Sequence, residues 1–106
     1  MSPPRLRIGT RRSALARAQA AWVRDRLAAF HAEIVIDLVP METRGDKLLD
    51  APLAKFGGKG LFVKELEEAL LRDEIDFAVH SLKDLETRMP EGLTLAAVTK
   101  RAPAEA

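Results

Sequence analysis

The sequence predicts an α/β domain with a mostly parallel sheet flanked by helices. Strand-type and helix-type patterns alternate along the 106 residues. In addition, residues 34–39 form a nearly continuous aliphatic run, which is typical of a parallel strand covered on both faces. Parallel strands are joined by right-handed crossovers, and ligands bind at the carboxyl ends of such strands. The strand ends are therefore where a functional site is expected.

The first half of the chain predicts a strand, a helix and a second strand. Residues 5–10 alternate basic and apolar side chains, as a strand does. Ser13 is placed to cap a helix by accepting a backbone N–H bond, and the helix is expected to end at about Phe30. The predicted strand at 34–39 ends at Pro40. The helix is expected to bury one stripe: Ala16, Ala20, Val23, Leu27 and Phe30.

The second half begins with residues 41–60, a long segment rich in charge and glycine. Loops of this length in a compact domain are usually functional or mobile. A helix is predicted over 61–72, with Lys64 and Glu68 spaced as an ion pair. Strands are predicted at 75–79 and 93–98. The buried stripe of the second helix is expected to comprise Phe62, Leu66, Ala69 and Leu70.

Composition excludes several classes of function. The 17 Lys and Arg residues nearly balance 16 acidic residues, which argues against a general nucleic-acid binder. The chain has no cysteine, so it contains neither a disulfide nor a thiolate metal site, and neither histidine has metal partners at ligand spacing. No apolar run approaches a membrane span or a secretory signal. We therefore expect a cytoplasmic protein without membrane or nucleic-acid partners.

Two of three polar segments at predicted strand ends are suited to anions. Arg11 and Ser13 follow the first strand and open the helix, where free backbone N–H groups attract anions. Lys55 and Lys59 lie in a glycine-rich stretch, where the backbone can approach a ligand closely. The alternatives are a capped helix with solvated arginines and a solvated flexible loop.

The third polar segment follows the strand at 75–79. Alternation along a strand places Val79 and Ser81 on one face and His80 on the other, where a structural role is expected for the histidine. Ser81, Lys83 and Asp84 then fall at the rim of the sheet. Lys83 and Asp84 could equally form a surface ion pair. A cleft with these groups suits a small ligand that carries carboxylates or phosphates.

Four blocks of sequence resemble the porphobilinogen deaminase (hydroxymethylbilane synthase) family. They are RIGTRRSALARAQA, LVPMETRGD, PLAKFGGKGLFVKELEEALL and DFAVHSLKD, in the order and spacing of the family's N-terminal domain. The resemblance implies a type II periplasmic-binding-protein-like domain, here incomplete. It also implies a role in tetrapyrrole (haem) biosynthesis, in which four porphobilinogen molecules are joined into hydroxymethylbilane with release of ammonia.

The resemblance also assigns roles to the candidate residues. Arg11, Ser13, Ser81 and Lys83 would bind the carboxylates of the substrate and of a dipyrromethane cofactor. Lys55 and Lys59 would belong to a loop that covers the cleft. Asp84 would be catalytic, because a carboxylate stabilises the positive charge that forms when the substrate loses ammonia.

The resemblance further suggests how the chain is organised. Residues 1–100 would be part of the first domain, and residues 101–106 diverge where the hinge to a second domain would start. The cysteine that holds the cofactor lies in the family's third domain and is absent from this chain. We therefore expect the isolated chain to be inactive and prone to self-association, whereas full-length members of the family are expected to be monomers.

Two other functions remain open from the residues alone. A small-anion binding module would bind a simple carboxylate or phosphate and would be indifferent to substitution of Asp84. A nucleic-acid-binding fragment fits the balanced charge poorly. The pairing of Lys83 with Asp84 favours the enzyme, because a pure anion site rarely places a carboxylate against its ligand.

Overall fold

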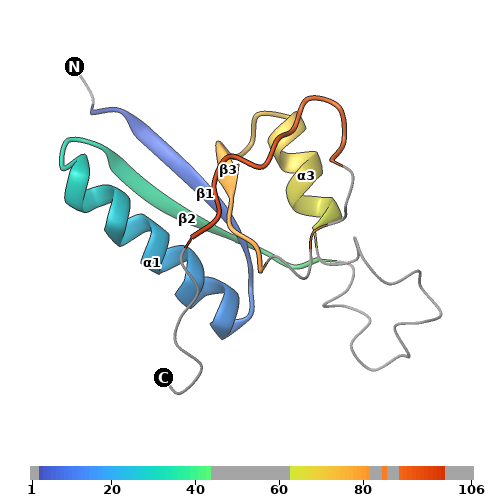
Figure 1. Cartoon of the computed structure of the whole chain (residues 1–106), viewed down its shortest axis with the longest axis horizontal. Coiled ribbons are helices and arrows are strands. Elements are labelled where there is room, and N and C mark those ends of the chain that lie inside the picture. Colours follow the sequence, from blue (N-terminus) through green and yellow to red (C-terminus); the bar gives the residue numbers. More distant parts are fainter. Residues whose placement is uncertain (1–2, 44–62, 82–84, 86–88, 100–106) are drawn as a thin grey trace.

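The structure is a computed structural model that describes residues 3–43, 63–81, 85 and 89–99. Within these residues the order is β1 (Arg5–Arg11), α1 (Ala14–Phe30), β2 (Val35–Met41), α3 (Lys64–Leu71) and β3 (Phe77–Ala78). The strands form one parallel sheet in the order β2-β1-β3 (Figure 1). The predicted α/β class and parallel sheet are therefore confirmed for this part of the chain.

Strand β1 is the centre of the sheet and fixes the edge at which the site lies. It pairs with β2 over its whole length and with β3 at two positions. The Asp76 backbone N–H donates to the Arg7 carbonyl at 2.9 Å, and the Val79 N–H donates to the Gly9 carbonyl at 3.2 Å. Because all three strands run in the same direction, their carboxyl ends meet at one edge. Helix α1 begins at that edge, directly after β1.

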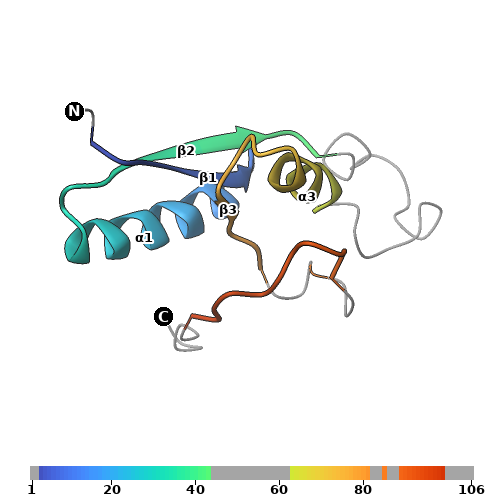
Figure 2. The ribbon, with the colours of Figure 1, turned by 90° about the horizontal axis from the view of Figure 1, so that it is seen from above.

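Helix α1 begins as predicted and packs along one face of β1 and β2 (Figure 2). Ser13 caps it, since its Oγ accepts a hydrogen bond from the Ala16 backbone N–H at 3.3 Å. Of the predicted stripe, Ala20 is fully buried. Phe30 is 75% exposed, so its predicted burial is wrong. It is the last residue of the helix, and no described segment covers it.

Two strand predictions need correction. Strand β2 continues through Pro40 to Met41, because it lies at an edge of the described sheet, where a proline without an N–H is tolerated. None of its residues is fully buried, so the expected cover on both faces is not seen in the described residues. Residues 93–98 form no strand. Leu95 and Val98 in that segment are exposed, so it lacks the packing that stabilises a strand.

The hydrophobic core lies between α3 and the sheet. Leu66, Ala69 and Ile75 are buried there, and Val39 and Met41 of β2 pack against them. The predicted burial of Leu66 and Ala69 is confirmed, whereas Phe62 lies outside the described residues.

Hydrogen bonds at the end of α3 turn the chain toward β3. Asp73 adopts a left-handed conformation with φ of 63°. The Glu74 N–H donates to the Ala69 carbonyl at 2.9 Å, and the Asp73 N–H donates to the Leu70 carbonyl at 3.2 Å. This is the Schellman arrangement that ends many helices. Glu68 pairs with Arg72 at 4.0 Å, one turn further along the helix, and not with Lys64 as predicted.

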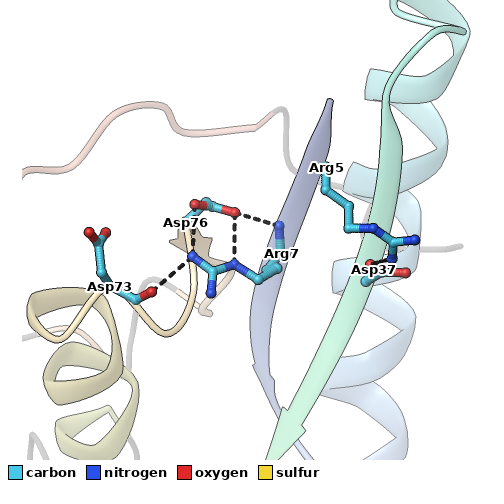
Figure 3. Close-up of polar contacts among 5 residues, drawn as sticks. All are labelled: Arg5, Arg7, Asp37, Asp73 and Asp76. Carbon is cyan, nitrogen blue, oxygen red and sulfur yellow. Dashed lines mark hydrogen bonds and ion pairs between the residues drawn. The ribbon is translucent and has the colours of Figure 1, made fainter. Parts of the chain in front are cut away.

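An arginine clamp, formed by Arg7, Asp73 and Asp76, holds the segment before β3 against β1 (Figure 3). The Asp76 carboxylate accepts hydrogen bonds from the Arg7 backbone N–H at 2.7 Å and from Nε and Nη2 at 3.2 Å. Arg7 Nη2 also donates to the Asp73 carbonyl at 2.9 Å. These hydrogen bonds lower the pKa of the Asp76 carboxyl and raise the pKa of Arg7. The clamp therefore fixes where β3, and the residues that follow it, meet the edge of the sheet.

Surface contacts complete the framework. Arg5 Nη1 lies 2.6 Å from Asp37 Oδ2 and joins β1 to β2 (Figure 3). On the outer side of α1, the Arg26 guanidinium lies 5.6 Å from the centre of the Trp22 ring. None of the helices in the described ranges combines the length and apolarity that crossing a bilayer requires.

Candidate functional site

A pocket lies at the carboxyl edge of the sheet, between the start of α1 and the residues that follow β3. It has a volume of about 70 Å³, and three predicted site residues line it: Arg11, Ser13 and Ser81. Gln19 and His80 add further polar groups, and Leu15, Ala16 and Val79 supply apolar surface. Residues up to 70 positions apart in the sequence therefore meet at the edge where ligands bind in parallel α/β sheets.

The two arginines after β1 have different environments. Arg11, the last residue of β1, is half-buried and lines the pocket. Arg12 is not among the lining residues, and its Nη1 lies 3.3 Å from Glu42 Oε2 in an exposed ion pair. The Arg12 backbone N–H donates to the Met41 carbonyl at 3.1 Å, which holds the turn against the end of β2. Arg11 is therefore the arginine of this turn that can meet a ligand in the pocket.

Ser13 has a structural contact and a position at the pocket. Its Oγ accepts from the Ala16 N–H and its carbonyl accepts from the Arg17 N–H, so it starts α1. The first turn of a helix carries backbone N–H groups without helical partners and the positive end of the helix dipole. Together with the Arg11 guanidinium, this helix end makes the pocket favourable for an anion.

The residues after β3 contribute two polar side chains to the pocket, one predicted from the sequence and one not. Ser81 lines the pocket as the sequence suggested, but His80 lines it too, although strand alternation had placed it on the opposite face. Because β3 ends at Ala78, the alternation of a strand does not extend to residues 79–81. The histidine could not be placed without knowing where the strand ends.

Gln19 is the site residue that sequence reasoning missed. It lies in the second turn of α1, and its Oε1 accepts a hydrogen bond from Ser81 Oγ at 3.3 Å. This bond joins α1 to the segment after β3. The sequence offered one local sign, a neutral polar residue beside the apolar stripe of Ala16, Ala20 and Val23, but this sign does not reveal a partner 62 positions away.

The other predicted site residues fall outside the part of the chain that the structure describes. These residues are Lys55, Lys59, Lys83 and Asp84. Lys83 and Asp84 follow Ser81 by two and three positions in the sequence. In the described ranges, no three His, Asp or Glu side chains gather as metal ligands would.

The described pocket has the chemistry of a carboxylate-binding site. A guanidinium offers paired N–H donors in a planar fork that matches a carboxylate, and hydroxyl and amide groups add neutral hydrogen bonds. Sites that enclose a whole small molecule usually have several hundred Å³. At about 70 Å³ the pocket that the described residues form is smaller than that.

Comparisons with known proteins agree with the resemblance in the sequence. The family model "Porphobilinogen deaminase, dipyromethane cofactor binding domain" matches residues 6–106. The chain is 60% identical over 101 residues to porphobilinogen deaminase of Trichlorobacter lovleyi, covering 95% of this chain and 32% of the relative. It is 57% identical, with the same coverage, to the porphobilinogen deaminases of Geobacter metallireducens and Geobacter sulfurreducens.

These matches span nearly all of this chain but about a third of the length of each relative. Arg11 at the end of β1 and Ser81 in the segment after β3 both lie within the matched residues. Because the family model covers residues 6–106, the chain belongs to the porphobilinogen deaminase family.

Proposed function

We propose that this chain is the N-terminal part of an enzyme that joins four porphobilinogen molecules into hydroxymethylbilane, and that the pocket binds carboxylate arms of the growing product. The observation that carries the proposal is the meeting of Arg11, Ser13 and Ser81 around one pocket at the start of α1. We further propose that residues 1–100 belong to a type II periplasmic-binding-protein-like first domain, and that residues 101–106 start the connection to a second.

The chemistry of the ligand explains the choice of residues. Porphobilinogen carries an acetate and a propionate side chain, so each addition brings two more carboxylates to the site. A carboxylate placed in water-poor surroundings needs cations and N–H or O–H donors to replace its hydration. Arg11 supplies the charge, and the first turn of α1 and the hydroxyl groups supply neutral donors. In this proposal the pocket binds the ligand through its carboxylate arms, and the pyrrole rings lie outside the pocket.

The described residues fit one carboxylate arm of a dipyrromethane cofactor. Such a group has two pyrrole rings with four carboxylate arms, and Arg11, Ser13 and Ser81 provide donors for one of these arms. When bound, the cofactor would supply the pyrrole to which the first substrate is joined. The chain itself has no cysteine, so it offers no thiol for covalent attachment.

The remaining site residues have proposed roles outside the described part of the chain. Asp84 would lie near the pyrrole nitrogens, stabilise the positive charge that develops as ammonia leaves, and move protons there. Lys83 would bind a further carboxylate. Lys55 and Lys59 would cover the cleft from the glycine-rich segment.

A chimera tests the proposal. It joins residues 1–100 of this chain to the rest of the Trichlorobacter lovleyi relative, because the chain matches 32% of that protein. We expect the chimera to form hydroxymethylbilane from porphobilinogen. Arg11→Gln should lower kcat/KM by about 10- to 100-fold, the effect of losing a charged hydrogen bond to the ligand.

The matched control is Arg12→Gln, the neighbouring arginine, which pairs with Glu42. It removes the same charge from the same turn without changing the pocket lining, and we expect less than about a twofold effect. If Arg11→Gln is as active as Arg12→Gln, the pocket does not bind the substrate or product. A chimera that binds porphobilinogen without forming product would favour the small-anion binding module.

A further inference from the structure

The hydrogen bond between Ser81 and Gln19 connects two parts of the pocket that are 62 residues apart. Ser81 Oγ is the donor and Gln19 Oε1 is the acceptor, at 3.3 Å in a partly buried position. Both side chains also line the pocket. The partner of the Ser81 hydroxyl is therefore a side chain of α1, and the Ser81 proton lies on the Gln19 side.

This arrangement limits what Ser81 can offer a ligand. A serine hydroxyl has one proton and two lone pairs. While the proton is donated to Gln19, Ser81 presents only lone pairs to the pocket, and lone pairs repel a carboxylate. For Ser81 to bind a carboxylate arm, its proton must turn away from Gln19, and its Oγ then needs a new donor.

A glutamine side chain can accept the Ser81 proton when the pocket is empty and donate to Ser81 Oγ when a carboxylate is bound. Its amide has an acceptor oxygen on one side and an N–H donor on the other, and the terminal torsion has a broad, two-fold preference. A rotation by about 180° therefore replaces Oε1 with Nε2 opposite Ser81. The amide then donates to Ser81 Oγ, and the Ser81 proton is free for the ligand.

We propose that Gln19 is a positioning residue that sets the direction of the Ser81 proton. Its amide accepts the proton in the structure described here, and rotates to donate to Ser81 Oγ when a carboxylate arm binds. The substrate class that this switch recognises is a carboxylate with no proton of its own to donate. The inference rests on the proposed function, because it requires that the pocket takes such an arm.

The stability of α1 does not depend on this bond. The helix starts at the Ser13 cap and is anchored by the buried Ala20. Leucine has a helix propensity similar to that of glutamine and nearly the same size. Gln19→Leu therefore removes the hydrogen bond while the helix is kept, and Gln19→Glu keeps an acceptor but removes the donor.

A double-mutant cycle in the chimera tests the proposal, with KM and kcat for porphobilinogen measured for Gln19→Leu, Ser81→Ala and the double variant. We expect each single substitution to raise KM by about 5- to 10-fold, the effect of one hydrogen bond, with a smaller change in kcat. Because Gln19 acts through Ser81, the double variant should be no worse than Ser81→Ala. Gln19→Glu should be worse than Gln19→Leu, since it keeps the Ser81 proton away from the ligand.

The control is Ala18→Leu, an exposed position on the same turn of α1, which should leave KM unchanged. Thermal midpoints of all variants should agree with that of the unsubstituted chimera within about 2 °C. Multiplicative effects in the double variant would overturn the inference, because Gln19 would then act independently of Ser81. The same holds if Ser81→Ala has no effect while Arg11→Gln does. An Arg11→Gln variant as active as Arg12→Gln would instead contradict the proposed function itself.

Discussion

Gly9 lies in the middle of β1, where the side chains of Leu66 and Ile75 pack against the strand. A Cβ added at this position would overlap Ile75 Cδ1 and would lie 2.9 Å from Leu66 Cδ2. Ile75 and Leu66 are both buried, at 2% and 0% exposure. The two side chains have no solvent into which they can move, so Gly9→Ala must displace them within a closely packed core.

Inserting a methyl group into a well-packed core costs about 1–3 kcal/mol. With an m value near 1–2 kcal/mol/M for a domain of this size, the urea midpoint should fall by about 1 M. Unfolding can be followed by the fluorescence of Trp22, because the chain has a single tryptophan. An unchanged midpoint would show that α3 does not pack on β1 at Gly9.

A second substitution tests whether Gly9→Ala lowers the stability through overlap with Ile75. Ile75→Val removes the Cδ1 atom that the new methyl group would overlap, and alone it should cost about 0.5–1.5 kcal/mol. Combined with Gly9→Ala, it should restore part of the packing. The double variant should therefore be more stable than the sum of the two single effects by about 1 kcal/mol. Simple additivity would refute the proposed contact between these two residues.

The remaining predictions concern the helix cap, the arginine clamp and the chemistry. Ser13→Ala should destabilise the protein by about 1 kcal/mol, measured by urea unfolding, because the cap on α1 is lost. The pKa of Asp76 is lowered in the folded protein by the hydrogen bond from Arg7. The clamp should therefore stabilise fully above about pH 5 and be lost as the pH falls through the folded pKa. Asp76→Asn should remove this part of the acid dependence in unfolding measured against pH, and an unchanged acid limb would contradict the clamp. Asp84→Ala in the chimera should lower kcat by about 100-fold or more, and near-normal turnover would exclude Asp84 from the mechanism. The isolated chain should form no hydroxymethylbilane, because it has no cysteine to hold the cofactor, and measurable product would refute this.

The sequence predicted correctly those features that depend on residues close together in the chain. The Ser13 cap, the extent of α1 and the burial of Leu66 and Ala69 follow from side-chain spacing and capping chemistry. The predictions failed where the outcome depends on distant neighbours. Phe30 fits the helical stripe but is 75% exposed in the described structure, and β2 passes through Pro40 because it lies at an edge of the described sheet.

At the candidate site, too, the predictions failed where a residue's role depends on a partner far away in the sequence. Arg11, Ser13 and Ser81 were predicted because parallel strands bring their carboxyl ends to one edge. Gln19 was missed because its importance depends on a hydrogen bond to a residue 62 positions away, which spacing within one helix does not show. The clamp was missed for the same reason, since Arg7 and Asp76 are 69 residues apart.

The most direct test is a crystal structure of the chimera with its dipyrromethane or a bound porphobilinogen-derived chain. If the pocket binds carboxylate arms, one carboxylate will lie about 3 Å from both the Arg11 guanidinium and Ser81 Oγ. If every carboxylate of the ligand is instead bound elsewhere and only water fills this pocket, the site has been assigned wrongly.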